Sequence, residues 1–285
     1  MSDKVLLFEM APRDGLQNEP HAISTADKIA LVNLLSATGL QKIETASFVS
    51  PKWVPQMADG ADVMAGIART QGVAYTALTP NMKGLERALE ANVDEVAVFG
   101  AASETFSQKN INCSISESLE RFEPVVARAV NEGLPVRGYV SCVTDCPYEG
   151  QIAPKAVAAV ARALKNMGSY DVSLGDTVGK GEPDRVTAML EAVLEHLPIH
   201  KVGAHFHDTN SRALDNIQAA LALGVRTFDA SSGGLGGCPY APGAAGNVAM
   251  EAVVDRLEAL GFETGINRKA LAEAAAFAQS LRRGT

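Results

Sequence analysis

The sequence has no concentrated basic segment and no long apolar run, and each absence excludes a class of protein. The net charge of −8 at pH 7 comes without a cluster of lysines or arginines. Nucleic acid and anionic membrane surfaces are therefore not expected as main partners, because both require a basic patch. No run of about 20 apolar residues occurs, so we expect no transmembrane helix.

Cysteines are few, and their spacing matches no known pairing motif. Cys113, Cys142, Cys146 and Cys238 show neither C-x-x-C spacing nor the density of a disulfide scaffold. The apolar stretch at residues 5–10 is too short for the core of a signal peptide. We therefore expect a reducing compartment and a cytoplasmic location.

The composition is that of a globular protein with a large core, because 47% of the 285 residues are hydrophobic and 20% are charged. Short apolar or β-branched runs alternate regularly with amphipathic helical patterns. The expected strands lie near residues 5–10, 42–47, 73–79, 94–100, 135–141, 170–175, 201–207 and 226–231.

Eight strand-helix units without a linker predict an α/β fold, a (β/α)8 TIM barrel that forms one domain over residues 1–285. Helix starts are expected after Ser24, at Pro154 and at Pro183. The tail at about 262–285 predicts an additional C-terminal helix, outside the barrel or across one end. A doubly wound open sheet is the alternative.

One strand carries two histidines. Side chains alternate along a strand, so His205 and His207 point to the same face, roughly 7 Å apart along the backbone. The pair could be hydrogen-bonded core histidines or metal ligands, and only further ligands from elsewhere would favour a metal. Asp208 points to the opposite face and is expected to be structural or to support a metal ligand from behind.

In an α/β barrel the active site lies at the C-terminal ends of the strands. Polar side chains gather at five of these ends, namely Arg13 and Asp14, Glu44 and Ser47, Asp176, His207, and Cys238 with Asn247. Because the seventh, eighth and first strands are neighbours, the sequence predicts a metal site made by Asp14, His205, His207 and Asn247. This mixed oxygen and nitrogen set suits Mg2+ or Mn2+ better than a structural zinc.

Several long motifs carry a family resemblance. Residues 11–19 (APRDGLQNE), 44–57 (ETASFVSPKWVPQM), 136–142 (VRGYVSC) and 234–241 (GLGGCPYA) resemble 3-hydroxy-3-methylglutaryl-CoA lyases. The likeness extends from about residue 5 to residue 265. It implies a metal-dependent TIM-barrel lyase that cleaves an acyl-CoA thioester to acetyl-CoA and acetoacetate, of the leucine-degradation and ketone-body type.

The resemblance also assigns roles to single residues. It matches Asp14, His205, His207 and Asn247 to the metal ligands, Arg13 to an essential cation and Cys238 to a catalytic loop cysteine. Glu44 and Asp176 line the site as proton relays or as carboxylates that hold Arg13. Gln17 and Ser47, with Arg13, are expected to bind the substrate. No counterpart of the animal enzymes' targeting segment is seen, which implies a bacterial-type cytoplasmic form.

The chemistry agrees with these residue types. A divalent ion can lower the pKa of a substrate hydroxyl, and Arg13 can stabilise a developing enolate oxygen. The glycine-rich loop around Cys238 permits closure over the substrate, and the thiol could then move a proton. That loop could instead bind phosphate, in which case Cys238 would be incidental. Arg137 is expected to be a buried, paired guanidinium beneath the site.

The sequence departs from the lyases after Thr209, where Asn210-Ser211-Arg212 replaces their usual Tyr-Gly-Gln. This change leaves a related 3-hydroxy-acyl-CoA open as the substrate. A Claisen-condensing acyl-CoA synthase and a non-catalytic, metal-stabilised binding protein are further alternatives. A homodimer or higher homo-oligomer is expected for a barrel of this size.

Overall fold

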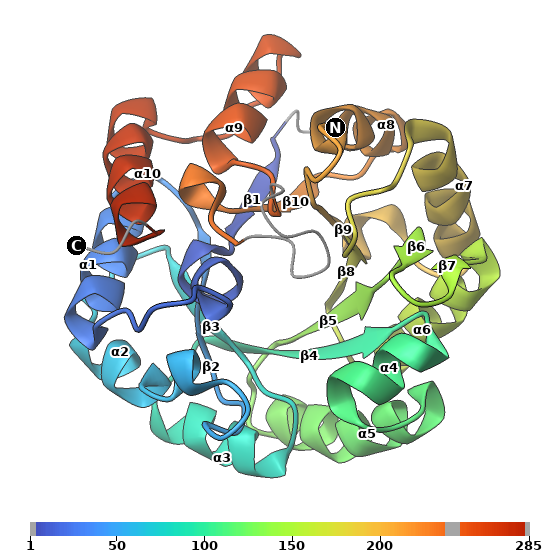
Figure 1. The fold of residues 1–285 in the computed structure, drawn as a ribbon, viewed down its shortest axis with the longest axis horizontal. Coiled ribbons are helices and arrows are strands. Elements are labelled where there is room, and N and C mark those ends of the chain that lie inside the picture. Colours follow the sequence, from blue (N-terminus) through green and yellow to red (C-terminus); the bar gives the residue numbers. More distant parts are fainter. Residues whose placement is uncertain (1–3, 237–245, 283–285) are drawn as a thin grey trace.

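A computed structural model describes residues 4–236 and 246–282 of the protein. Eight parallel strands close into a barrel in the order β1-β10-β9-β8-β5-β4-β3-β2 (Figure 1). Their bounds are β1 Leu6–Glu9, β2 Lys42–Ser47, β3 Ala74–Leu78, β4 Glu95–Ala101, β5 Val136–Ser141, β8 Asp171–Asp176, β9 Val202–Phe206 and β10 Thr227–Ala230.

The predicted barrel is confirmed. Each predicted strand agrees with the observed one to within one residue at either end, because each is an apolar run bounded by turn or helix signals. β1 pairs with both β10 and β2, which closes the sheet and excludes the doubly wound alternative. A short hairpin that we did not predict, β6 (Asp145–Cys146) with β7 (Gly150–Gln151), follows β5.

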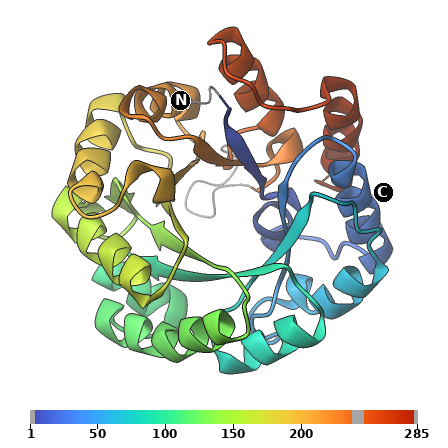
Figure 2. The same cartoon turned by 180° about the vertical axis from the view of Figure 1, so that it is seen from behind.

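Helices alternate with the strands and surround the barrel, as seen from its two ends in Figure 1 and Figure 2. They are α1 Thr25–Ser36, α2 Gly60–Gly66, α3 Met82–Glu90, α4 Glu104–Ile111, α5 Ile115–Asn131, α6 Pro154–Met167, α7 Pro183–Leu194, α8 Ala213–Leu223, α9 Met250–Ala259 and α10 Arg268–Arg282. The Ser24 side chain accepts a hydrogen bond from the backbone N–H of Asp27 and so caps α1, as the sequence predicts. Pro154 and Pro183 begin their helices, where a missing N–H costs nothing.

The predicted C-terminal helix is α10, which lies outside the barrel and packs against α1 (Figure 1). Short turns complete the chain: η1 (Ala11–Gly15), η2 (Pro55–Met57), η3 (Ile199–Lys201) and η4 (Ser232–Gly234). Within the described residues, no helix combines the length and apolar character needed to span a membrane.

Side chains alternate along the strands, so one set faces the surrounding helices and the other faces the inside of the barrel. Val96, Val98 and Val140 belong to the large apolar layer between barrel and helices. Inside the barrel a small apolar cluster that includes Phe8 and Tyr139 accompanies buried charged residues. The barrel interior is therefore partly polar, and its charges can be directed toward one end.

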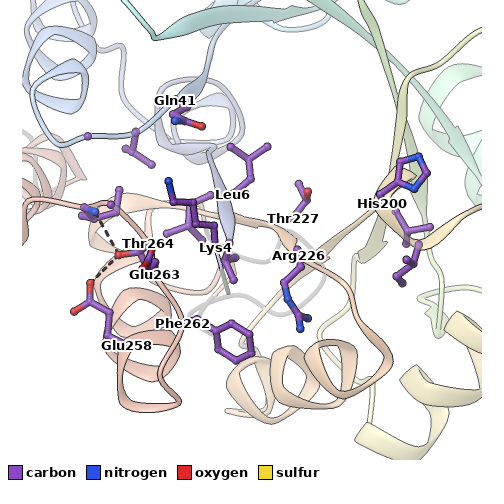
Figure 3. A pocket seen from close by; sticks show the side chains of 18 residues that line it. Lys4, Leu6, Gln41, His200, Arg226, Thr227, Glu258, Phe262, Glu263 and Thr264 are labelled. Atoms are coloured by element: carbon purple, nitrogen blue, oxygen red, sulfur yellow. Dashed lines mark hydrogen bonds between the residues drawn. The ribbon is translucent and has the colours of Figure 1, made fainter. Parts of the chain in front are cut away.

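A cavity of about 790 Å³ opens where β1, β9 and β10 begin. Figure 3 shows Lys4, His200, Arg226 and Phe262 around it. None of the candidate ligand residues lines this cavity, because they lie at the opposite, C-terminal ends of the strands. The chemistry expected from the sequence therefore belongs to the other end of the barrel.

Candidate metal centre and active site

Three predicted ligands converge at the C-terminal end of the barrel. Asp14 lies in the turn after β1, His205 is on β9, and His207 follows that strand directly. Each offers a ligand atom, and these atoms all lie within 4.8 Å of one another. Asn247, the fourth predicted ligand, pairs with His207 in a β-bridge and donates from Nδ2 to Asp14 Oδ2 at 2.8 Å.

The residues fit a divalent cation. Asn247 Oδ1 and His207 Nδ1 are buried, and neither has a hydrogen-bond partner in the part of the chain that is described. Unsatisfied buried acceptors are costly, and a cation is a partner that can satisfy acceptors from several side chains at once. One carboxylate, one amide oxygen and two imidazoles favour a hard or borderline divalent ion.

The electrostatics place Asp14 and His207 in the protonation states that metal binding needs, whereas burial of His205 is outweighed by the hydrogen bond and charge of Asp229, which raise the pKa of His205. Burial favours the neutral form of Asp14, but Arg13 and the two imidazoles lower the pKa of this carboxyl below its usual range. Burial and the neighbouring His205 lower the pKa of His207 to about 4. Near neutral pH Asp14 is therefore an anion, and His207 keeps a free lone pair.

Arg13 lies between two carboxylates. Its Nη1 donates to Asp14 Oδ1 at 2.7 Å, and its Nε donates to Glu44 Oε2. Burial opposes the charge, but these carboxylates raise the pKa of the guanidinium above its ordinary value. Tyr139 donates its hydroxyl to the other oxygen of Glu44 at 3.0 Å. Glu44 is thus placed as the carboxylate that holds Arg13, one of the two readings left open by the sequence.

Asp176 has a different environment. Its carboxylate accepts from Thr144 Oγ1 and from the backbone N–H of Gly181, both at 2.8 Å. Burial raises its pKa against these hydrogen bonds. Among the described residues, Arg13 forms its ion pairs with Asp14 and Glu44 and not with Asp176, so holding that arginine is not supported as the role of Asp176. The side chain still lies at the C-terminal end of β8, on the side where the metal ligands converge.

The two other residues predicted to bind the substrate each have a buried oxygen that could accept a hydrogen bond from it. Gln17 Oε1 and Ser47 Oγ are buried without a hydrogen-bond partner among the described residues. Cys238 falls outside the described residues. At the rim, Arg212 forms an exposed ion pair of 3.2 Å with Glu182, so the departure from the lyase pattern places a paired cation there.

Sequence reasoning missed several buried carboxylates, among them Asp229 and Glu9. Asp229 lies on β10 between Phe228 and Ala230 and is opposite His205 in the strand register. Arg137, the predicted buried guanidinium, lies between Asp171 and Asp229, at 2.7 and 2.8 Å. The available signal was an acidic residue within an apolar strand, a combination that requires a buried partner.

Glu9 ends β1 and is fully buried beneath the η4 turn. Its carboxylate accepts from the backbone N–H of Ala11, and from both the backbone N–H and the hydroxyl of Ser232. Burial outweighs these hydrogen bonds and raises its pKa to about 7. The folded protein therefore retains a proton on Glu9 over a pH range in which the unfolded chain has lost it.

The free energy of unfolding of the wild type is expected to fall as the pH rises because Glu9 loses its proton. Glu9→Gln should abolish this fall. Because the folded-state pKa exceeds the unfolded value, wild-type stability falls from about pH 4.5 to about pH 7. From pH 5 to pH 8, the free energy of unfolding of the variant should rise by roughly 2 to 3 kcal/mol relative to that of the wild type. Urea unfolding at both pH values measures this change. The exposed Glu86→Gln is the control, and a wild-type-like pH dependence in Glu9→Gln would refute the assignment.

Comparison with known proteins shows the family of this chain. The HMGL-like family model matches residues 4–278. A Pseudomonas aeruginosa protein named 3-hydroxy-3-isohexenylglutaryl-CoA/hydroxy-methylglutaryl-CoA lyase is 57% identical, over 95% of this chain and 90% of its own. The mitochondrial hydroxymethylglutaryl-CoA lyase of Bos taurus is 53% identical, over 99% and 87%.

Solved structures show the same relationship. The HMG-CoA lyase of Brucella melitensis superposes with a TM-score of 0.97 at 58% identity, over 98% of this chain and 99% of its own. An HMG-CoA lyase from Acinetobacter baumannii in complex with coenzyme A and 3-methylmalate has a TM-score of 0.94 at 37% identity, over 99% and 92%. The chain therefore belongs to the HMGL-like family.

Proposed function

We propose that this protein is a carbon-carbon lyase that cleaves 3-hydroxy-3-methylglutaryl-CoA to acetyl-CoA and acetoacetate with the help of Mg2+ or Mn2+. The observation that carries the proposal is the position of Arg13, one residue from Asp14 and beside a cluster that can hold a divalent ion. The names of relatives that are 57% and 53% identical over nearly the whole chain support the substrate.

The reaction is a retro-Claisen cleavage. A base removes the proton of the 3-hydroxyl, the bond between C2 and C3 breaks, and its electron pair forms the enolate of the thioester. Protonation of the enolate carbon gives acetyl-CoA, and the hydroxyl carbon becomes the ketone of acetoacetate. A divalent ion held by Asp14, His205, His207 and Asn247 would supply Lewis-acid stabilisation of the substrate oxygens.

The protein's own groups would position charge and exclude water. The permanent charge of Arg13 would stabilise the enolate oxygen, and Glu44 would keep the guanidinium in place from the side opposite Asp14. The unused atoms of Gln17 and Ser47 would bind polar groups of the substrate. Asp176 would line the site and relay protons, and the Cys238 thiol would transfer a proton from its loop.

A second substrate is favoured by two observations. The P. aeruginosa relative is named for 3-hydroxy-3-isohexenylglutaryl-CoA as well as for the methyl compound. The chain also carries Asn210-Ser211-Arg212 at the predicted rim of the pocket, where the lyases that it resembles usually have Tyr-Gly-Gln, so contacts to the substrate can differ there. A branched or longer 3-hydroxy-3-alkylglutaryl-CoA is therefore the second candidate, while the homo-oligomeric state and the cytoplasmic location remain predictions.

The test is an assay of purified protein stripped of metal. The protein is incubated with 3-hydroxy-3-methylglutaryl-CoA in thiol-containing buffer, with and without Mg2+ or Mn2+, and both products are followed. Stoichiometric, metal-dependent release of acetoacetate and acetyl-CoA is expected. Cleavage of only the isohexenyl compound would move the assignment to that substrate, and cleavage of neither by folded, metal-loaded protein would refute it.

A further inference from the structure

We propose that Asp229 is a positioning residue that orients the His205 ring, so that Nε2 faces Asp14, and thereby sets the affinity of the site for a divalent ion. The inference rests on the candidate metal site and not on the identity of the substrate. Asp229 does not itself belong to the cluster of ligand atoms formed by Asp14, His205 and His207. It acts through His205 from the neighbouring strand.

The geometry begins with strand register. Asp229 on β10 pairs with His205 on β9, so both side chains point into the barrel at the same height. Asp229 Oδ2 lies 3.3 Å from His205 Nδ1 and accepts from Ser173 Oγ at 2.7 Å. The His205 ring is therefore held at Nδ1, which leaves Nε2 as its free nitrogen.

The direction of this hydrogen bond follows from Arg137. Its Nη1 forms an ion pair of 2.8 Å with Asp229 Oδ1, and a carboxylate that is paired with a guanidinium can only accept hydrogen bonds. The proton between the two groups therefore belongs to His205 Nδ1. A neutral imidazole with its proton on Nδ1 has its lone pair on Nε2, the atom that can bind a cation.

Arg137 is itself held rigidly below the site. Only 1% of its side chain is exposed, its Nε donates to Asp171 at 2.7 Å, and its guanidinium lies 4.0 Å from the centre of the Phe8 ring. A Cβ atom at Gly203 would come within 2.7 Å of Arg137 Nη2. A side chain at position 203 would therefore displace the guanidinium that forms the ion pair with Asp229.

The second histidine is oriented in a different way. The His207 ring forms a hydrogen bond with the backbone of Thr177, and its Nδ1 is buried and has no partner among the described residues. The two histidines thus present different ring nitrogens, Nε2 from His205 and Nδ1 from His207. A side-chain substitution can remove the support of His205, whereas that of His207 comes from the main chain.

The experiment measures Mn2+ affinity of the full-length, metal-stripped protein without substrate, by the loss of the free Mn2+ EPR signal. Asp229→Asn keeps the shape of the side chain but loses the charge that orders the ring, and we expect Mn2+ to bind about 10- to 100-fold more weakly. Ser173→Ala is the matched control, because it removes the other hydrogen bond to the same carboxylate oxygen. An equal Mn2+ affinity for the wild type and Asp229→Asn would overturn the proposal.

A double-mutant cycle separates positioning from general damage. If Asp229 acts through His205, it should matter little once His205 is gone. In a His205→Gln background, adding Asp229→Asn should therefore weaken Mn2+ binding by less than about twofold. A full additional loss in that background would contradict the mechanism. Because no turnover is measured, a protein that binds Mn2+ as expected but cleaves no thioester would refute the proposed function alone.

Asp229→Asn leaves Arg137 with one fewer buried anion, so it could fail to fold. The wild type then provides the test, by NMR of protein labelled with 15N-histidine at pH 9. The chain has five histidines, and the His205→Gln spectrum assigns the one of interest. A hydrogen-bonded proton on Nδ1 of His205 is expected. A ring that carries its proton on Nε2 alone would overturn the proposal.

Discussion

Arg13→Gln is expected to lower kcat for thioester cleavage by about 1,000-fold or more, with a much smaller change in Mn2+ affinity. The substitution removes a permanent charge that is held between Glu44 and Asp14, while glutamine still offers a hydrogen-bond donor. Stabilisation of the enolate is lost, although the metal ligands themselves are intact. Steady-state kinetics at saturating Mn2+ with 3-hydroxy-3-methylglutaryl-CoA measure the effect.

Two controls make the Arg13 result specific. Arg128→Gln makes the same chemical change in an exposed ion pair on α5 and should leave kcat unchanged, because such surface pairs contribute little. Glu44→Gln frees the guanidinium without removing it and should give an intermediate loss. Circular dichroism must show that Arg13→Gln is folded. A kcat within tenfold of wild type in a folded Arg13→Gln protein would exclude Arg13 from the chemistry.

The second large effect is expected from Asp14→Asn, which should weaken Mn2+ binding by about 100-fold or more and abolish activity at physiological metal concentrations. Asp14 is the only anion in the described three-residue cluster, and the charges around it lower the pKa of its carboxyl. The neutral amide loses the Coulomb attraction to the cation and also the ion pair with Arg13. EPR titration measures binding, and the acetoacetate assay measures activity.

Asp208→Asn is the matched control for Asp14→Asn. Asp208 follows His207 directly, but its carboxylate accepts from the backbone N–H of Ala213 at the start of α8. Because asparagine keeps the Oδ1 acceptor for this N–H, its substitution should change stability little and leave Mn2+ affinity near the wild-type value. Equal loss of affinity in both variants would mean that helix order, not direct ligation, determines metal binding.

The barrel and the grouping of Asp14 with the two histidines could be predicted because the signals are local. A strand is recognisable from its own apolar run, and the alternation of its side chains places His205 and His207 on one face whatever surrounds them. Closure of eight such units brings the ends of the first, seventh and eighth strands together, which is how Asp14 could be grouped with the histidines. The family motifs are also contiguous in sequence and need no structure to be seen.

The partners of these residues could be decided only by the tertiary structure. Whether Glu44 or Asp176 holds Arg13 depends on how the turn after β1 is placed against β2 and β8, and the structure assigns that contact to Glu44. Asp229 meets His205 because β10 and β9 pair in one particular register. A shift of one residue would turn its side chain to the other face.

The amino-acid sequence by itself thus determined the strands, the fold class, the family and the residue types at the C-terminal ends of the barrel strands. The tertiary structure alone decided which carboxylate faces which cation, and that it is Nδ1 of His205 that faces Asp229. The reason is physical: hydrophobic periodicity is a property of each segment, whereas ion pairs and hydrogen bonds inside a barrel depend on register between segments far apart in the chain.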